Sequence, residues 1–450
     1  MSQLIASSNN AVIVGLGVTG LSVARYLQSE GQPFVIADSR TQPPMLEAFT
    51  RECPNARLHL GPFAMDEFKN AGRIILSPGV ARSEPAIAAA IAAGIEVVGD
   101  IEIFARAARA PIVAITGSNG KSTVTSLLGA MAETAGIKVK VGGNLGTPAL
   151  DLLDDDAELY VLELSSFQLE STLRLSARVA TVLNVSADHM DRYPSMALYH
   201  LAKQRIYFGA QSVVANREDA LTRPPVADDV PQISFGLNQP DLKDYGIRKE
   251  GSESYLAKGL VNLLPAQAVA LKGRHNLANA LSALALGDLA GIPQAAMLSC
   301  LQSFQGLPHR CQWVGSKNDV MFINDSKATN VGATVAALEG LVGEQGNNII
   351  LIAGGDGKGA DFSSLTPVLL NTLRALVVIG RDGPQIAGLV KESLQVVEAA
   401  SLQEAVVLAS GLAKAGDTVL LSPACASFDM FKNYEDRGNQ FAAAVEQLCA

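Results

Sequence analysis

The sequence predicts an α/β fold divided into three domains, each built on a mostly parallel sheet. The chain has 450 residues, and at about 150 residues per domain this length suggests three domains. Hydrophobic residues make up 48% and charged residues 18%, a balance that is typical of ordered α/β proteins and excludes a disordered chain. Short Val/Ile-rich runs alternate with Ala/Leu-rich stretches, and this pattern, the sign of βαβ units, begins three times along the chain.

The first third contains the elements of a Rossmann-like domain. Strands are predicted at 11–15, 34–38 and 73–79, and a helix at Leu21–Ser29 follows the first strand. The helical sequence IEIFARAARAP then begins a new unit, so we place the limits of this domain at 1–99.

The central third begins a second sheet. Its predicted strands are 111–117, 160–165 and 179–185, and its first predicted helix is 121–134. We place the limits of this domain at 100–306.

The last third predicts another Rossmann-like domain, at 307–450. Its predicted strands are 320–325, 348–355, 375–380 and 418–423, and helices are predicted at 329–339 and 402–414. Ahead of it, the stretch 217–272 is rich in proline and short polar segments and could hold a hairpin insertion.

Charge and composition exclude several classes of protein. The net charge is −9, from 35 Lys and Arg against 44 Asp and Glu, and no basic block points to a nucleic-acid binder. The longest apolar stretch, Ala86–Ile95, is too short to cross a membrane. The N-terminus lacks the features of a secretory signal, and five scattered cysteines form no CxxC pair, so we expect a cytoplasmic protein without a disulfide framework.

The strongest local motif is ITGSNGKST, residues 115–123, which lies between a predicted strand and a predicted helix. We name residues 117–123 the phosphate loop, because a glycine-containing turn before a helix points backbone N–H groups at phosphate. Lys121 would contact terminal phosphates, and one of the two hydroxyl residues after it would bind Mg²⁺. The motif is a shorter variant of the P-loop pattern GxxxxGK[ST], which has Gly where this chain has Ile115.

A second glycine motif, GLGVTG, follows the first predicted strand, and Asp38 ends the next strand. We name residues 15–20 the first glycine loop. Its glycines permit a tight turn and a close approach to phosphate, and the acid can bind a ribose hydroxyl. The motif predicts a nucleotide crevice, but it does not distinguish a nicotinamide cofactor from another nucleotide, so an NAD-dependent oxidoreductase stays open at this point.

Polar groups also follow two predicted strands of the central third. Glu163 lies at the end of one strand, and Asp188 and His189 follow another. Because open parallel sheets bind ligands at this edge, Glu163, His189 and Ser122 could share Mg²⁺ sites. For each residue alone, a structural hydrogen-bonding role is the simpler interpretation. Lys203, in the helical sequence LAKQRIYF, is interpreted from the pattern alone as a solvated helix lysine.

Three polar loops follow predicted strands of the last third. They are NDSKATN (324–330), GGDGKGADF (354–362) and SPACASFDMFKN (422–433). The carboxyl ends of parallel strands share one edge of a sheet, so we expect these loops to form one crevice. A ligand with two carboxylates needs two separate clamps, which Lys327, Lys358 and Ser427 could supply.

Taken in order, these motifs resemble the Mur ligase family, the ATP-dependent amino-acid ligases of peptidoglycan precursor synthesis. TGSNGKST resembles the ATP loop of the family, the segment 275–281 its adenine-side segment, and PHR at 308–310 its domain junction. GLGVTG, LSPGV at 76–80, NDSKATN, GGDGKGADF and the longer segment LSPACASFDMFKNYEDRGNQF at 421–441 are similar to those of members that add D-glutamate. The likeness runs nearly from end to end.

The resemblance implies an ATP-dependent ligation with one domain for each substrate. The first domain would bind the uridine diphosphate of UDP-N-acetylmuramoyl-L-alanine, the central P-loop-type ATPase domain would bind ATP, and the third would bind D-glutamate. The reaction would form an acyl phosphate, which the D-glutamate amine attacks. A ligase similar to folylpolyglutamate synthetase is a further alternative, although it has no use for a uridine-nucleotide domain.

The resemblance also implies the residues of each site. Those expected to be catalytic are Lys121, His189 and Lys203. Those expected at ATP are Gly117, Ser118, Asn119, Gly120, Lys121, Ser122, Thr123, Asn276, Asn279, Arg310 and Asp325. Those expected at the uridine-nucleotide substrate are Gly15, Gly17, Val18, Thr19, Asp38, Ser39, Arg40, Gly79, Asn144 and Gln168. Those expected at D-glutamate are Lys327, Thr329, Lys358, Ser427, Phe428 and Tyr434. At the last two positions the family pattern leads us to expect Leu and Phe.

The implied cofactors are ATP and two Mg²⁺ ions, with Ser122, Glu163, His189 and a carbamylated Lys203 as metal ligands. A carbamate would replace the interpretation of Lys203 as a solvated lysine. His189 is also a candidate acceptor for the proton of the attacking amine. The expected partners are the two small-molecule substrates, and we expect a monomer that neither binds nucleic acid nor inserts into a membrane.

Overall fold

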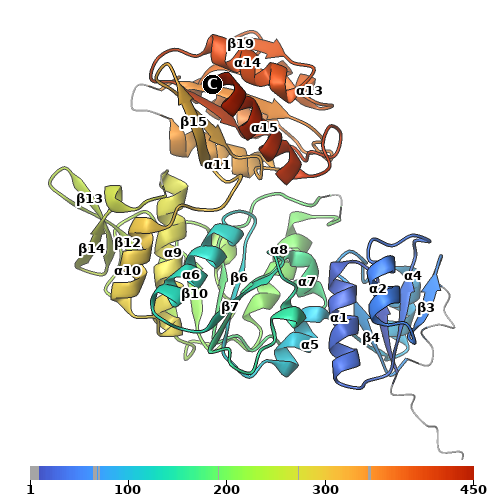
Figure 1. The fold of residues 1–450 in the computed structure, drawn as a ribbon. Helices are drawn as coiled ribbons and strands as arrows, with labels where there is room; N and C mark the ends of the chain where they lie inside the picture. The colour runs from blue at the N-terminus through green and yellow to red at the C-terminus, as the bar shows by residue number, and fades with distance from the viewer. Residues whose placement is uncertain are drawn as a thin grey trace, which may run out of the picture.

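The computed structural model describes residues 10–63, 68, 71–190, 192–271, 273–342 and 346–449. Three bodies follow one another along the chain in Figure 1, coloured blue, green to yellow, and orange to red, and each contains one sheet. The predicted α/β class, with three mostly parallel sheets, is confirmed. No helix in the described part of the chain is both long and apolar enough to cross a membrane.

The first body has a parallel five-stranded sheet in the order β3-β2-β1-β4-β5. Its strands are β1 (Ala11–Val14), β2 (Phe34–Asp38), β3 (Arg57–Leu60), β4 (Arg73–Leu76) and β5 (Glu96–Gly99), and its helices are α1 (Val18–Ser29), α2 (Leu46–Glu52) and α4 (Pro85–Ala92). The strand order switches between β1 and β4, which places a crevice at their carboxyl ends. Helix α1 begins before the predicted Leu21, because the last glycine of the first glycine loop already lies inside the helix.

The central body has a nine-stranded sheet in the order β14-β13-β12-β11-β10-β9-β6-β8-β7. Its strands are β6 (Ile112–Thr116), β7 (Val139–Gly143), β8 (Leu159–Glu163), β9 (Val179–Val182), β10 (Val213–Asn216), β11 (Gln232–Phe235), β12 (Tyr245–Glu250), β13 (Glu253–Lys258) and β14 (Val261–Pro265). Its helices are α5 (Asp100–Ala107), α6 (Lys121–Thr134), α7 (Ser166–Glu170), α8 (Met196–Gln204), α9 (Arg274–Ala290) and α10 (Gln294–Ser303). The antiparallel strands β12 to β14 confirm the predicted hairpin insertion, at the edge away from the first body (Figure 1).

Apolar residues on both faces of the central sheet explain why its parallel strands are buried. Val113 and Ile115 of β6 pack with residues of α6 and α9, whereas Ala114 of the same strand joins the core on the opposite face. Successive strand side chains point to opposite faces, so an unbroken apolar strand requires cover on both sides.

The third body has a six-stranded sheet in the order β15-β16-β20-β17-β18-β19, parallel except for the pair β15 and β16. Its strands are β15 (Gln312–Lys317), β16 (Val320–Asn324), β17 (Ile349–Gly354), β18 (Leu373–Ile379), β19 (Gln395–Glu398) and β20 (Thr418–Leu421). Its helices are α11 (Val331–Leu341), α12 (Thr366–Thr372), α13 (Gly383–Gly388), α14 (Leu402–Leu412) and α15 (Tyr434–Cys449). Two apolar clusters fill its two faces.

The junctions between the bodies bring their polar loops together. Gly99 ends β5 and Asp100 begins α5, and a Cβ at Gly99 would lie 2.3 Å from the Ser171 hydroxyl, so this connection packs tightly. The second junction lies between the end of α10 at Ser303 and the start of β15 at Gln312. Helix α11 of the third body packs against α9 of the central body. The loops of the third sheet therefore face the carboxyl edge of the central sheet.

Candidate functional site

The first glycine loop opens into a crevice at the carboxyl edge of the first sheet. A Cβ at Gly20 would lie 2.0 Å from the carbonyl oxygen of Gly15, and Gly15 itself has a φ of +95°. These two glycines are therefore required by the close contact between loop and helix. Gly17 differs, because nothing lies within 4 Å of the position its Cβ would take, so its missing side chain leaves space in the crevice.

All ten residues expected at the uridine-nucleotide substrate line this one crevice. Asp38 is 2% exposed, accepts hydrogen bonds from the backbone N–H of Leu16 (2.6 Å) and pairs with the Arg40 guanidinium (2.6 Å). Burial alone would raise the pKa of Asp38, but the hydrogen bonds from Arg40 and Leu16 outweigh it and hold this pKa below its usual value. The crevice thus contains a fixed carboxylate and a half-exposed cation. Asn144 and Gln168 reach it from the central body.

The phosphate loop connects β6 to the N-terminus of α6. Gly120 has a φ of +81°, and a Cβ there would lie 2.6 Å from the Asn279 side-chain oxygen, so glycine is needed at the turn. The Lys121 ammonium donates to the carbonyl oxygens of Gly117 (2.8 Å) and Ser118 (2.9 Å). The loop therefore joins free helical N–H groups to a cation, the arrangement that binds phosphate.

A second cavity joins the phosphate loop to the third body. Its lining includes the expected residues Lys121, Ser122, Asn144, Glu163, His189, Lys203, Lys327, Thr329, Lys358, Ser427, Phe428 and Tyr434. The structure thus brings together the candidate metal ligands and all six residues expected at D-glutamate. Asn144 also lines the crevice of the first sheet, so it marks where the two spaces meet.

Lys203 is buried rather than solvated. Its side chain is 1% exposed, and its ammonium donates to the carbonyl oxygen of Gly117 at 2.8 Å. Burial, and next the charge of Lys121, hold the pKa of Lys203 well below that of an ordinary lysine. The interpretation of Lys203 as a solvated helix lysine is therefore wrong, because its face of α8 turns toward the phosphate loop.

The residues expected at Mg²⁺ fit such an ion by the chemistry of their donors. One carboxylate oxygen of Glu163 accepts from the Asn144 amide at 2.6 Å, whereas the other is buried without a hydrogen-bond partner. Such an orphaned buried oxygen is costly unless a cation or water engages it. No three His, Cys, Asp or Glu side chains gather as a metal cluster among the described residues. Mg²⁺ usually keeps waters and phosphate oxygens as ligands, so one carboxylate with hydroxyl and imidazole neighbours is sufficient.

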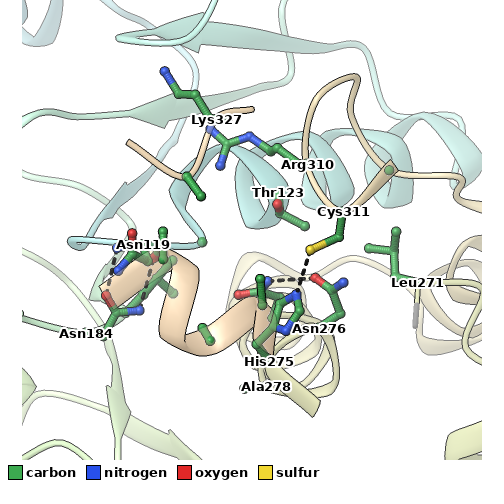
Figure 2. A pocket seen from close by; sticks show the side chains of 18 of the residues that line it. Asn119, Thr123, Asn184, Leu271, His275, Asn276, Ala278, Arg310, Cys311 and Lys327 are labelled. Atoms are coloured by element: carbon green, nitrogen blue, oxygen red, sulfur yellow. Dashed lines mark hydrogen bonds between the residues drawn. The ribbon is translucent and has the colours of Figure 1, made fainter. Parts of the chain in front are cut away.

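A third cavity lies between the phosphate loop, α9 and α11 (Figure 2). Seven residues expected at ATP line it: Asn119, Gly120, Thr123, Asn276, Asn279, Arg310 and Asp325. Ser118, Lys121 and Ser122 instead line the second cavity, and Gly117 accepts hydrogen bonds from both lysines described above. The two cavities share Asn119, Gly120, Arg310 and Lys327. They therefore meet at the phosphate loop.

Figure 2 shows that this cavity is polar at both ends. Asn119 and Asn184 exchange two hydrogen bonds at one end, of 2.8 and 3.0 Å, and the Cys311 thiol lies 3.8 Å from the His275 ring nitrogen at the other. Asp325 is buried against the Ser422 hydroxyl, and burial raises its pKa to about 6. A flat heterocycle with polar edges suits such a space.

The third body contributes a cationic face to the second cavity. The Lys327 ammonium lies 3.8 Å from the centre of the Tyr434 ring, and burial lowers the pKa of Lys327 to about 8. Lys358 has a φ of +51°, and Phe428 is 70% exposed at the rim. Phe428 and Tyr434, which stand where the family pattern leads us to expect Leu and Phe, thus still line the cavity.

Several polar residues near these cavities were not among the predicted site residues. Arg437 of α15 is fully buried and donates to the carbonyl oxygens of Ser326 (2.8 Å) and Cys425 (3.1 Å), so it ties two loops of the third body together. The Tyr199 hydroxyl lies 3.0 Å from that of Ser118. Tyr199 lies in no motif. Arg437 lies in the family-like segment 421–441, but an arginine in a polar helical stretch gives no local sign that it is buried.

Three family models match most of the chain. "Mur ligase MurD-like, N-terminal domain" matches residues 9–99, "Mur ligase middle domain" matches 115–287, and "Mur ligase, glutamate ligase domain" matches 309–425. Proteins named UDP-N-acetylmuramoylalanine--D-glutamate ligase from Pseudomonas fluorescens and Pseudomonas aeruginosa are each 54% identical over 446 residues. The protein of that name from Marinobacter nauticus is 53% identical over 446 residues. Each alignment covers 99% of this chain and 100% of the relative.

Solved structures share the fold at lower identity. A pseudomurein peptide ligase type C from Methanothermus fervidus aligns with a TM-score of 0.61 and 19% identity, over 98% of this chain and 100% of that chain. A UDP-N-acetylmuramate-alanine ligase from Thermotoga maritima aligns with a TM-score of 0.60 and 19% identity, over 98% and 99% of the two chains. These similarities show that the three-body fold is shared.

Proposed function

Because the chain belongs to the Mur ligase family, we propose that it is the ATP-dependent ligase that joins D-glutamate to UDP-N-acetylmuramoyl-L-alanine. The products are the amide, ADP and phosphate, in the synthesis of peptidoglycan precursors. The observation that carries the proposal is the second cavity, in which the phosphate loop of the central body faces Lys327, Lys358 and Ser427 of the third. An NAD-dependent oxidoreductase would use neither of these features.

The three spaces suit the three substrates in sequence. The uridine diphosphate occupies the crevice of the first sheet, with the N–H groups of the first glycine loop on the diphosphate and Asp38 and Arg40 at the nucleoside. The sugar and L-alanine extend past Asn144 and Gln168 toward the second cavity. ATP lies in the third cavity and presents its γ-phosphate where the two cavities meet at Lys121.

The first step is attack of the alanine carboxylate on the γ-phosphate. An oxygen–phosphorus bond forms, the bond to ADP breaks, and ADP leaves with the electron pair. Both reactants are anionic, so the Lys121 ammonium must turn from its loop carbonyls to the phosphates. Mur ligases use Mg²⁺, and when bound the ion neutralises further charge on these anions. Ser122, Glu163 and His189 would hold it.

The second step is attack of the D-glutamate amine on the acyl carbon. Lys327, Thr329, Lys358 and Ser427 hold the two carboxylates, so the amine points at the acyl phosphate. Phosphate leaves with the bonding electrons, and the amine loses a proton as the amide forms. His189 lies in the same cavity and is the proposed acceptor of that proton when its ring nitrogen does not hold the metal.

Lys203 is proposed to carry a carbamate. Its lowered pKa favours the neutral amine, which can attack carbon dioxide: a nitrogen–carbon bond forms, the electron pair of one C=O π bond moves to oxygen to give a carboxylate, and the amine proton leaves to solvent. The new carboxylate would complete the donors around a second Mg²⁺ beside Glu163 and His189. We further propose that the enzyme acts in the cytoplasm as a monomer, with domains at 1–99, 100–306 and 307–450.

Joint substrate dependence tests the proposal. Purified chain with ATP, Mg²⁺, UDP-N-acetylmuramoyl-L-alanine and D-glutamate should release phosphate and form one amide per turnover, and omitting either substrate should stop amide formation. Reduction of NAD without ATP turnover would overturn the proposal. Turnover with a folate and L-glutamate instead would favour the ligase similar to folylpolyglutamate synthetase.

A further inference from the structure

Asn330 connects the third body to two loops of the central body. It is the last residue of the NDSKATN loop and the N-cap of α11, where its side-chain oxygen accepts from the Ala333 N–H at 2.9 Å. Its amide nitrogen donates to the side-chain oxygen of Asn119 at 3.3 Å and to the carboxylate of Asp188 at 3.2 Å. One amide therefore joins the start of α11, the phosphate loop and the loop that carries His189.

Both partners of Asn330 are themselves held in place. The Asn119 backbone exchanges hydrogen bonds with the Asn184 side chain, which fixes the phosphate loop. The other carboxylate oxygen of Asp188 accepts from the His189 N–H at 2.9 Å. A Cβ at Gly332 would lie 3.1 Å from the Ser186 hydroxyl, so the first turn of α11 already sits against the central body.

The position of Asn330 in the chain gives these contacts a consequence for the reaction. Thr329 and Lys327, which are proposed to hold D-glutamate, lie one and three residues before it. A shift of the Asn330 backbone would therefore move both clamps away from the phosphate loop. Positioning errors of about 1 Å can cost on the order of 10²-fold in rate.

We propose that Asn330 is a positioning residue that holds the D-glutamate clamps against the phosphate loop until the acyl phosphate has reacted. The proposal rests on the proposed ligase function. When the contact is lost, the third body separates from the loop, water reaches the acyl phosphate, and the phosphate is released without forming an amide. Asn330 itself takes part in no covalent step.

The N-cap role of Asn330 can be separated from its role between the bodies. Asn330→Asp keeps a side-chain oxygen that caps α11, since Asn and Asp are similarly good N-caps. It removes the amide donors to Asn119 and places a second carboxylate against Asp188. Asn371→Asp, on the exposed face of α12, adds the same charge to the third body away from the cavities and serves as the matched control.

The ratio of phosphate released to amide formed tests the proposal. The unmodified enzyme and Asn371→Asp should give one phosphate per amide. Asn330→Asp should release at least about twice as much phosphate as amide and lose about tenfold in kcat/KM for D-glutamate, the scale of a lost hydrogen bond to a charged group. Its melting temperature should match that of the control. A ratio of one in Asn330→Asp would overturn the proposal.

A donor–acceptor exchange provides the second test. Adding Asp188→Asn to Asn330→Asp restores an amide opposite a carboxylate. The double variant should therefore release less phosphate per amide formed than Asn330→Asp alone. A purely structural role for Asn330 predicts additive losses, and additivity would contradict the proposal. The unmodified enzyme distinguishes the proposed ligase function from the proposed role of Asn330. If the proposed function is wrong, the unmodified enzyme forms no amide. If only the role of Asn330 is wrong, the unmodified enzyme still forms the amide.

Discussion

The first glycine loop and the phosphate loop are built alike but differ in how the charges around them are paired and solvated. Both follow the first strand, along the chain, of a mostly parallel sheet and lead into a helix. At the first loop the Arg40 side chain is 52% exposed and nothing fills the space beside Gly17. At the phosphate loop Lys203 is 1% exposed and Glu163 is 3% exposed, with one oxygen unpaired. Asp38 at the first loop is also buried, but it is paired with Arg40. The comparison teaches that a glycine loop makes a phosphate site, and that buried charges without a full set of partners around it make a reaction site.

The physical reason is the cost of desolvated charge. Burying an ammonium or a carboxylate without full pairing destabilises the fold. Proteins retain such groups where the charges act on a reacting group. Asp38 is buried too, but hydrogen bonds from the Leu16 N–H and from the half-exposed Arg40 guanidinium satisfy it, so this pair costs less and contributes to binding. We therefore expect changes at the phosphate loop to lower kcat and changes at the first glycine loop to raise KM for the uridine-nucleotide substrate.

The largest effect is expected for Lys121→Ala. Loss of the ammonium leaves the attacking carboxylate and the γ-phosphate without their nearest protein cation, so kcat should fall on the order of 10³-fold. Steady-state phosphate release and amide formation measure this loss. Lys391→Ala, which removes an exposed lysine, is the matched control and should keep full activity. A higher KM for ATP with an unchanged kcat would show that the two loops do not differ in the expected way.

The next largest effect is expected for Lys203→Ala, at about 10²-fold in kcat, because a metal ligand would be lost. Added acetate or propionate should restore part of the activity by supplying the missing carboxylate in the space left by the side chain. The same acids should not rescue Lys121→Ala, which lacks a cation rather than a carboxylate. If Lys203→Ala keeps full activity without added acids, the carbamate proposal is wrong.

Lys203 also shows where sequence reasoning reached its limit. The strands, the glycine loops and the crevice at each sheet edge follow from local patterns, since apolar runs and glycine turns specify backbone on their own. The burial of Lys203 depends on which face of α8 packs toward the phosphate loop, and residues 203 and 117 are far apart in the chain. The family resemblance supplied a role for Lys203, whereas the pattern alone pointed to solvent.

Asn330 and Arg437 were harder still to predict. The local sequence around Asn330 indicates only an ordinary helix N-cap. Its hydrogen bonds to Asn119 and Asp188 form only where the third body meets the central body. Arg437 lies in a polar helical segment, where an arginine is normally solvated, yet it is buried beneath two loops. Both roles arise from long-range packing, which no short pattern encodes.

The second and third glycines of the first glycine loop, Gly17 and Gly20, should separate binding from folding. Gly20→Ala forces a Cβ against the Gly15 carbonyl and should destabilise the protein by about 2 kcal/mol, as in other overpacked sites. Gly17→Ala meets no atom and has a φ of −95°, which any residue adopts, so its stability should not fall. It should instead raise KM for the uridine-nucleotide substrate about tenfold, because the methyl group enters the space for the diphosphate. Urea unfolding and steady-state kinetics measure the two effects, and equal destabilisation of both variants would contradict the distinction.

The smallest effect is expected for Arg40→Ala. Removing a half-exposed cation from the crevice should raise KM for the uridine-nucleotide substrate about fivefold, the scale of an ordinary solvent-accessible hydrogen bond. KM for ATP and kcat should stay unchanged, since Arg40 lines neither of the other cavities. Arg57→Ala removes an exposed arginine of β3 and is the matched control. A fall in kcat would contradict the separation of binding at one loop from chemistry at the other.

The Asp38 carboxylate gives Arg40→Ala a pH signature as well. The hydrogen bonds of Arg40 and Leu16 hold the pKa of Asp38 below the ordinary value of 3.8, so ionised Asp38 stabilises the fold above that pH. This stabilisation is lost as the pH falls through the lowered pKa of the folded state. Without Arg40 the pKa of Asp38 should rise, so the melting temperature of the variant should fall furthest below that of the unmodified protein near neutral pH. The difference should shrink as the pH drops below about 4, and a constant difference would show that Arg40 stabilises the crevice by packing instead of charge.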